Sequence, residues 1–219
     1  MKLEGLKINF LGDSITEGAG VADGNNIYWR RLERDCGLAV ARGYGIGGTR
    51  FAKQSKPSAN ERWDRDFCTR LHEMDDDADV LVIFGGTNDF GHGDAPLGEL
   101  TDRTPDTFCG ACHTLFSEAI AKYPEATIVV MTPLHRGNEE NLRGDGNKPA
   151  DVAPLSTYVD IIKQVAAFYS LPVLDLFAMG GLQPRVRVIQ QKYCPDGLHP
   201  NDAGHAIIAR RLAGFLSTL

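Results

Sequence analysis

Short apolar runs alternate along the chain with longer segments in which apolar residues recur at spacings of three and four. The short runs are nearly unbroken and rich in β-branched residues, as strands buried on both faces require. Their alternation with amphipathic helices is typical of a parallel sheet covered on both sides and predicts an α/β fold. We expect strands at residues 7–11, 38–41, 80–84, 126–131 and 171–174, and helices at residues 26–36, 60–74, 105–123, 155–169 and 202–216.

The length and the charge of the chain narrow its organisation and its partners. A chain of 219 residues, 42% of them hydrophobic, can bury one sizeable core, and no linker or repeat divides it. We therefore expect a single domain over residues 1–219. The formal net charge of −6 at pH 7 and the scattered lysines and arginines offer no basic stripe for a phosphate backbone. Nucleic acid is not an expected partner, whereas a homo-oligomer is left open.

The N-terminal segment and the cysteines bear on the compartment. The first seven residues interrupt every apolar stretch with a charge, so they lack the apolar core of a signal peptide, and no run approaches a membrane span. Five cysteines are an odd set in a chain large enough to fold without disulfides, and we expect free thiols. These features indicate a cytoplasmic protein with no membrane partner, unless an export segment was removed earlier.

A serine follows the first apolar run. Ser14 lies in a Gly-Asp-Ser-Ile-Thr segment at residues 12–16, where the chain is expected to turn from strand to helix. A hydroxyl on such a turn projects from the carboxyl edge of the sheet, where ligands bind in open α/β folds. Thr16 stands at the second glycine of the G-x-S-x-G nucleophile elbow, so that motif is absent. Ser14 is a candidate nucleophile and Asp13 a candidate pocket residue. The alternative is an ordinary helix cap.

A carboxylate and an imidazole stand three positions apart near the other end of the chain. Asp196 and His199 belong to an Asp-Gly-Leu-His-Pro segment immediately before the last expected helix. On one turn, the carboxylate can accept a hydrogen bond from one ring nitrogen while the other nitrogen faces a serine. These are the parts of a serine nucleophile, so the two ends of the chain are predicted to build one site. The alternative is a capping turn that ends in a solvated histidine.

Two glycine-containing segments follow the second and third expected strands. In the Gly-Gly-Thr-Asn-Asp segment at residues 85–89, Asn88 can present two amide hydrogens to an oxyanion, and Asp89 is expected to hold the loop. Residues 43–48 match G-x-G-x-x-G, but a dinucleotide site expects that motif after the first strand, with an acidic residue about 20 positions later. We interpret this segment as a loop whose Gly48 N–H faces the same pocket. A local Asn-Asp turn and a flexible loop are the alternatives.

Further polar residues lie near the expected strand ends. The three aspartates at 75–77 are expected to form a solvated turn rather than a metal site. His135 follows the fourth expected strand and is a candidate for lining the pocket and contacting the substrate, although an exposed loop histidine fits equally well. The irregular stretches at residues 91–105 and 135–154 follow strands at the same edge and are expected to frame the substrate.

Taken in order, the segments around Ser14, Gly48, Asn88 and His199 resemble the four blocks of the GDSL or SGNH hydrolase family, over residues 10–204. The resemblance implies a three-layer α/β/α sandwich with a five-stranded parallel sheet in the order 2-1-3-4-5, and ester hydrolysis without a metal or other cofactor. It also implies that Ser14 is the nucleophile, His199 the base and Asp196 its orienting partner. The oxyanion hole would consist of the Ser14 and Gly48 amides and the Asn88 side chain.

Together these features predict a serine hydrolase that cleaves carboxylic esters through an acyl-enzyme. The expected partner is a small-molecule ester, either short-chain or linked to a carbohydrate, with acetyl esters as the example. A thioesterase or lysophospholipase is an alternative that needs an apolar acyl groove, and the sequence offers no long amphipathic lid. A non-catalytic flavodoxin-like binding module is an alternative from another class. One departure from the resembled family is Gly43, where an asparagine is common.

Overall fold

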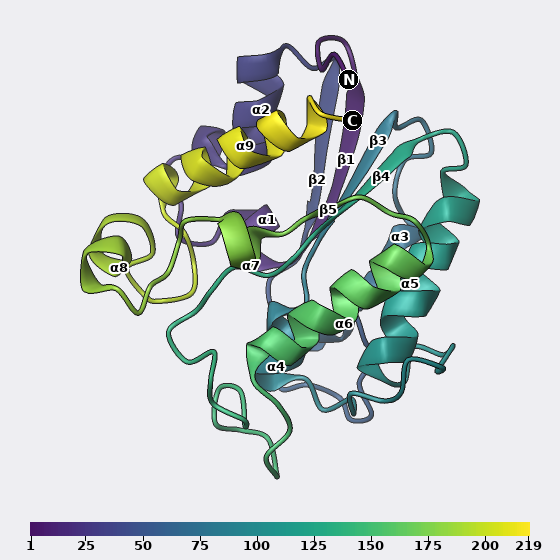
Figure 1. Ribbon diagram of the computed structural model, residues 1–219, viewed down its shortest axis with the longest axis vertical. Helices are drawn as coiled ribbons and strands as arrows, with labels where there is room; N and C mark the ends of the chain where they lie inside the picture. The colour runs from purple at the N-terminus through teal and green to yellow at the C-terminus, as the bar shows by residue number, and fades with distance from the viewer.

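The protein contains a five-stranded sheet in which all neighbouring strands are parallel and follow the order β2-β1-β3-β4-β5. The computed structural model describes all residues from Met1 to Leu219 (Figure 1). Helices cover both faces of the sheet, so the predicted α/β/α sandwich and its strand order are confirmed. The strands are β1 (Lys7–Gly12), β2 (Val40–Gly45), β3 (Val80–Phe84), β4 (Thr127–Met131) and β5 (Val173–Leu174).

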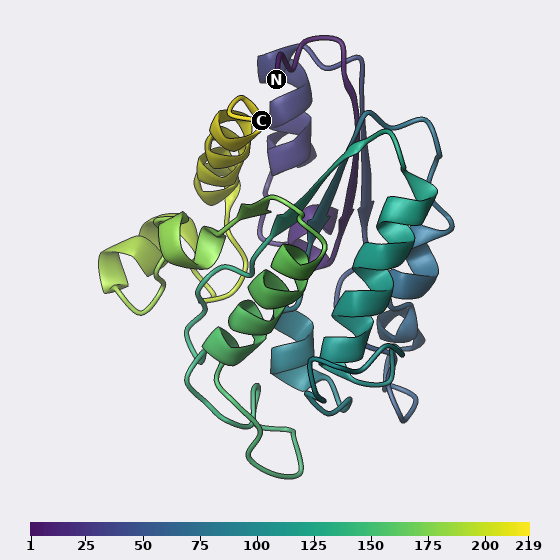
Figure 2. The same ribbon diagram turned by 45° about the vertical axis from the view of Figure 1, so that its right-hand side comes forward.

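The helices that pack on the two faces of the sheet form two layers (Figures 1 and 2). One layer contains α2 (Tyr28–Cys36) and α9 (Asp202–Leu216), which pack against each other. The other layer contains α3 (Phe67–Leu71), α5 (Phe108–Lys122) and α6 (Leu155–Phe168). The short elements are α1 (Ser14–Glu17), α4 (Thr87–His92), α7 (Leu176–Met179), α8 (Arg187–Tyr193) and the 3-10 turns η1 (Gly24–Asn26) and η2 (Glu61–Asp64).

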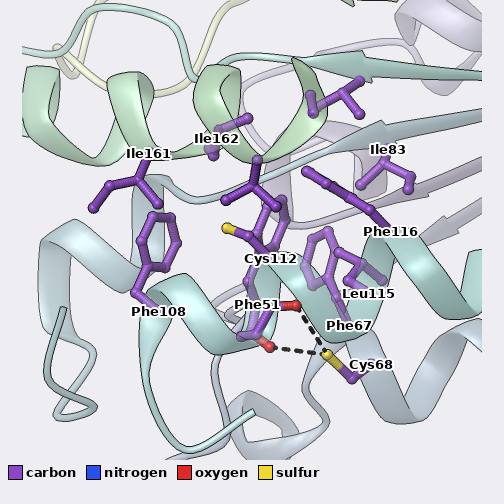
Figure 3. Close-up of a cluster of buried hydrophobic side chains, with 14 of the residues drawn as sticks. Phe51, Phe67, Cys68, Ile83, Phe108, Cys112, Leu115, Phe116, Ile161 and Ile162 are labelled. Atoms are coloured by element: carbon purple, nitrogen blue, oxygen red, sulfur yellow. Dashed lines mark hydrogen bonds between the residues drawn. The ribbon is translucent and has the colours of Figure 1, made fainter. Parts of the chain in front are cut away.

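Side chains of the central strands alternate between two hydrophobic cores, as the two-residue period of a strand requires. Phe10 of β1 and Val82 of β3 face the core beneath α2 and α9. Leu11 and Ile83, the next residues along, face the core beneath α3, α5 and α6 (Figure 3). The central strands are therefore buried on both faces, which explains their nearly continuous apolar sequences.

The second strand differs from the prediction. β2 ends at Gly45, four residues past the expected end at residue 41, so part of the expected glycine loop continues the strand. A Cβ atom on Gly43 would lie 2.5 Å from the Trp29 ring, and one on Gly45 would lie 2.2 Å from the backbone nitrogen of Glu17. These glycines allow α2 and α1 to approach the strand closely. The local composition does not distinguish glycines in such a strand from glycines in a loop.

The long helix α5 begins at Phe108, three residues after the expected start, and the remaining larger differences concern short elements. The helix expected at residues 60–74 is divided into η2 and α3, because Asp66 caps a new helix by accepting the Thr69 N–H at 2.8 Å. β5 has two residues instead of the expected four, and the short helices α4, α7 and α8 were not predicted, whereas α1 begins at the expected turn from strand to helix. By contrast, α6 and α9 agree with their expected ranges to within one residue. None of the helices has the length and apolar character needed to cross a bilayer.

Candidate active site

Three chain segments lie side by side at the carboxyl edge of the sheet. β1 leads through Asp13 into α1, β2 leads into a loop at residues 46–53, and β3 leads through two glycines into α4. Because β2, β1 and β3 are adjacent in the sheet, the residues that follow them share one edge. The structure therefore places the segments of Ser14, Gly48 and Asn88 next to one another.

The structure brings Ser14, His199 and Asp196 into one hydrogen-bonded series. Ser14 Oγ lies 3.0 Å from His199 Nε2, and His199 Nδ1 lies 2.7 Å from Oδ2 of Asp196. The other carboxylate oxygen accepts the backbone N–H groups of Leu198 and His199, at 2.9 and 2.7 Å. Burial opposes ionisation of Asp196, but these hydrogen bonds outweigh it and hold its pKa below the ordinary value. An ionised Asp196 keeps the ring proton on Nδ1 and leaves Nε2 free to accept the Ser14 proton.

Asp13 fixes the start of the helix that carries Ser14. Its Oδ1 accepts the Ile15 N–H at 3.0 Å, which caps α1. The side chain lines a small enclosed hollow together with Thr87 and Leu198, and the residue is only 2% exposed. Burial raises the pKa of Asp13 to about 6, although the hydrogen bond from Ile15 opposes that shift. The candidate pocket residue Asp13 thus lies beneath the turn that carries Ser14, in an enclosed space.

Replacing Asp13 by asparagine should stabilise the fold at neutral pH, because an amide oxygen can still accept the Ile15 N–H without a buried charge. The pKa rises from 3.8 to about 6 on folding, so the favourable contribution of this carboxyl is complete below pH 3.8 and is lost as the pH rises through 6. Thermal unfolding at several pH values should show a gain on the order of 3 kcal/mol above pH 6, shrinking towards pH 4. A gain that does not depend on pH would contradict this assignment.

The loop after β2 can accept only glycine at position 48. Gly48 has a φ of +78°, and a Cβ atom there would lie 2.2 Å from the Trp63 ring. The loop is joined to α1, because Gly47 N–H donates to the Glu17 carboxylate at 2.7 Å. A Cβ atom on Gly47 would lie 3.5 Å from the Ser14 Cβ. The backbone of this loop is therefore in contact with the turn that carries Ser14.

The far side of this loop is anchored in the hydrophobic core. Phe51 is fully buried, with its ring centroid 4.8 Å from that of Phe67 and 6.0 Å from that of Phe108 (Figure 3). The Cys68 thiol donates to the Phe51 carbonyl oxygen at 3.6 Å, which is one of the dashed lines in Figure 3. These contacts hold the loop that carries Gly48 from below.

A buried arginine joins the same loop to two strand ends. Arg70 of α3 donates to the carbonyl oxygens of Tyr44 and Gly12, at 2.7 and 3.0 Å, and to the Thr49 hydroxyl at 2.8 Å. Burial lowers the pKa of Arg70 to about 10, so the guanidinium keeps its charge at neutral pH. One side chain therefore fixes the ends of β1 and β2 relative to the loop.

Asn88 is held on the other side of this loop. Its side-chain amide donates to the Thr49 carbonyl oxygen at 3.0 Å, and the second amide hydrogen stays available. The neighbouring Asp89 accepts the N–H groups of Phe51 and Ala52 at 2.9 and 3.0 Å, so it holds the loop as expected. The candidate oxyanion donors thus occupy one connected piece of structure.

Comparison with known proteins agrees with this arrangement. Residues 10–207 match the model of the GDSL-like lipase/acylhydrolase family. The chain belongs to this family. A GDSL lipase from Mycobacterium tuberculosis is 26% identical over 212 residues, which cover 94% of this chain and 80% of that protein. The predictions of a GDSL-type protein and of a carboxylic ester hydrolase are confirmed at the level of this family.

Solved structures show how widely the fold is shared. A protein from Lactobacillus plantarum is 29% identical, and the match covers 98% of each chain with a TM-score of 0.83. A two-domain esterase active on acetylated mannans is 19% identical, with a TM-score of 0.60 over 98% of this chain and 49% of its own. At 19% identity, the similarity to this esterase shows a shared fold alone.

His135 of this GDSL-like hydrolase forms no hydrogen bond to Ser14 or His199. Its Nδ1 is 2.8 Å from a carboxylate oxygen of Glu139, and its ring centroid is 3.9 Å from that of Phe177. A hollow of about 380 Å³ beside the histidine turn is lined instead by Arg136, Gly137, Asn138, Asp196, Gly197 and Leu198. The role of His135 in contacting the substrate stays a prediction, and the next residue along the chain, Arg136, borders the hollow.

An aromatic pair flanks the candidate oxyanion donors. Neither of its residues was predicted from the sequence to belong to the site. The Trp63 ring lies against Gly48, and its centroid is 4.7 Å from that of His92, which follows Asn88 by one helical turn. Arg50 donates to the Trp63 carbonyl oxygen at 3.0 Å and thereby supports the turn that carries this ring. Burial lowers the pKa of His92 to about 4, so this ring is neutral at physiological pH.

The aspartates at 75–77 form ion pairs. Arg42 contacts Asp75 at 3.3 Å and Asp77 at 2.9 Å, and Asp76 pairs with Lys122. No three side chains of His, Cys, Asp or Glu are grouped so that they could hold a metal ion. This cluster is therefore a charged surface near the amino ends of the strands, on the edge opposite the GDSL-type site.

Proposed function

We propose that the protein hydrolyses carboxylic esters with Ser14 as the nucleophile. The observation that carries this proposal is the series from Ser14 Oγ to His199 Nε2, at 3.0 Å, and from His199 Nδ1 to Asp196, at 2.7 Å. Ser14 Oγ attacks the ester carbonyl carbon while its proton passes to Nε2. The imidazolium then protonates the departing alcohol, and an acyl-enzyme forms. Water repeats the sequence on the acyl-enzyme, which releases the acid and restores Ser14.

The developing negative charge needs hydrogen-bond donors that are already in place. The backbone N–H groups of Ser14 and Gly48 have no acceptor within the protein, and Asn88 has one free amide hydrogen. We assign these three donors to the oxyanion. Loss of one such donor typically lowers kcat by about 100- to 1000-fold. Hydrolysis of p-nitrophenyl acetate by the Ser14→Ala variant tests the whole proposal.

We propose a short acyl group and a polar alcohol, such as a carbohydrate, for the substrate. Five of the six residues that line the hollow beside the histidine turn are charged, polar or glycine, with Leu198 as the exception. On the other side of the site, the Trp63 ring occupies the space next to Gly48 and limits the room for an acyl chain. The similar fold of an esterase active on acetylated mannans supports the same class of substrate.

Replacing Trp63 by alanine should extend the range of acyl chains, because the indole ring stands directly beside Gly48. Each methylene that finds apolar room is worth about tenfold or more in kcat/KM. The ratio of kcat/KM for p-nitrophenyl hexanoate to that for the acetate should therefore rise at least about tenfold. The matched control, Trp63→Phe, keeps a ring and should shift the ratio less. An unchanged ratio in Trp63→Ala would show that the indole does not border the acyl group.

We propose that the protein is cytoplasmic. All five cysteines are free thiols, and four of them are buried. Thiols persist in reducing compartments, where glutathione and thioredoxin keep them reduced. The cysteine chemistry of the chain therefore suits a reducing environment.

A further inference from the structure

Arg136 is a buried cation at the carboxyl end of β4. It is only 4% exposed. One terminal nitrogen donates to the Thr87 carbonyl oxygen at 3.1 Å and approaches the Thr87 hydroxyl at 3.3 Å. The other terminal nitrogen pairs with Asp145, and Nε donates to Asn138 at 2.8 Å. All three nitrogens are engaged by the protein, so this guanidinium is fixed in place.

The contacts of Arg136 reach the segment that carries Asn88. Thr87 begins α4 and directly precedes Asn88, so the arginine holds the first turn of that helix by its backbone. The helix has no side-chain cap of its own, because Gly86 stands at its N-cap position. The place of the Asn88 amide therefore depends on contacts from outside the helix.

The next residue reaches the segment that carries the base. Gly137 N–H donates to the Gly197 carbonyl oxygen at 2.8 Å, within the turn between Asp196 and His199. Two consecutive residues after β4 are therefore bonded to both the turn that carries Asn88 and the turn that carries His199. A rigid connection of this kind fixes the distance between a hydrogen-bond donor and a general base.

We propose that Arg136 is a positioning residue for ester hydrolysis, which sets the Asn88 amide at a fixed place relative to His199. This inference rests on the proposed function, because it assigns Asn88 to the oxyanion. Arg136 forms no hydrogen bond to Ser14, and its contacts with Thr87 are the ones through which we expect it to act on the rate, by way of Asn88. A misplacement of about 1 Å can lower a catalysed rate by about 100-fold.

A double-mutant cycle between Arg136 and Asn88 tests this role. Arg136→Gln should lower kcat for p-nitrophenyl acetate by about 10- to 100-fold with little change in KM, since the loss concerns the transition state. Added to Asn88→Ala, the same substitution should lower kcat by less than about twofold, because the donor that it positions is already absent. Losses that multiply in the double variant would overturn the proposal.

Two further variants distinguish the positioning role of Arg136 from a general effect on the loop or the fold. Arg136→Lys keeps the charge but has one nitrogen in place of three, so it should restore kcat only in part; complete restoration would overturn the proposal. Arg143→Gln changes an exposed arginine of the same loop, which donates to the Lys148 carbonyl oxygen at 2.7 Å, and should leave kcat unchanged. Thermal unfolding of each variant identifies any that does not fold, and the cycle is then built on Arg136→Lys.

The failure of this inference differs from the failure of the proposed function. Full activity of Ser14→Ala would remove the proposed function and this inference with it. An inactive Ser14→Ala together with wild-type kcat in Arg136→Gln would remove only the positioning role.

Discussion

Replacing Ser14 by alanine should abolish ester hydrolysis and leave the fold intact. Ser14 Oγ makes its only hydrogen bond to His199 Nε2, at 3.0 Å, so alanine removes the attacking atom without leaving a second partner unpaired. The cap of α1 is supplied by Asp13 and is unaffected. Loss of a nucleophile that works as a unit with its base lowers kcat by about 10⁴- to 10⁶-fold. Release of p-nitrophenol from the acetate ester measures this directly.

The matched control for this experiment is Ser117→Ala. Ser117 lies on α5, where its hydroxyl donates to the His113 carbonyl oxygen of the same helix at 2.8 Å. This variant should retain the wild-type rate, and circular dichroism should show the same helix content in both. Hydrolysis by Ser14→Ala at the rate of the control would mean that another residue is the nucleophile.

Replacing Asp196 by asparagine should lower kcat by about 10³- to 10⁴-fold with little change in structure. The amide oxygen can still accept the N–H groups of Leu198 and His199, which now bond to Oδ1 of the carboxylate. The amide nitrogen, however, then faces His199 Nδ1 and requires an acceptor there. The ring proton moves to Nε2, and the imidazole can no longer take the proton of Ser14.

The pH dependence of the Asp196→Asn variant distinguishes a change of the His199 tautomer from protonation of the carboxylate. Hydrogen bonds hold the pKa of Asp196 below its ordinary value, so the wild-type carboxylate stays ionised at mildly acidic pH. The asparagine variant should therefore be slow at every pH between about 5 and 9, since no titration restores the carboxylate. Asp160→Asn, an exposed aspartate on α6, serves as the control and should follow the wild-type profile. Recovery of the variant at alkaline pH would contradict the tautomer argument.

The sheet and the serine series could be predicted because their signals are local or are carried by a few short segments. The strands β3 and β4 are continuous apolar runs, which are typical of strands buried on both faces of a sheet. Ser14, Asn88 and His199 follow or precede predicted elements, and parallel strands bring their carboxyl ends to a single edge. The order of these elements, together with their resemblance to the four blocks of the GDSL or SGNH family, was therefore enough to predict that Ser14 and His199 share one site.

The supporting residues could not be predicted in the same way. Arg70 contacts residues 26, 58 and 21 positions away, and Arg136 contacts Thr87 across 49 positions. No local pattern distinguishes such an arginine from one on the surface. The glycines of β2 were wrongly assigned to a loop. They are needed in the strand because Trp29 and α1 approach it closely, and these lie in another part of the chain. Helices as short as α1 and α4 contain too few residues to show a period.

The separation of Ser14 from His199, 185 positions along the chain, has a consequence for biosynthesis. A ribosome adds about 5 to 20 residues per second, so the serine is made roughly 10 to 40 seconds before its base. His199 also precedes α9, which packs against α2. A serine without its base is a weak nucleophile. On the proposed mechanism, a nascent chain that already contains most of the sheet is inert toward esters, and the hydrolase becomes active when α9 has emerged and docked.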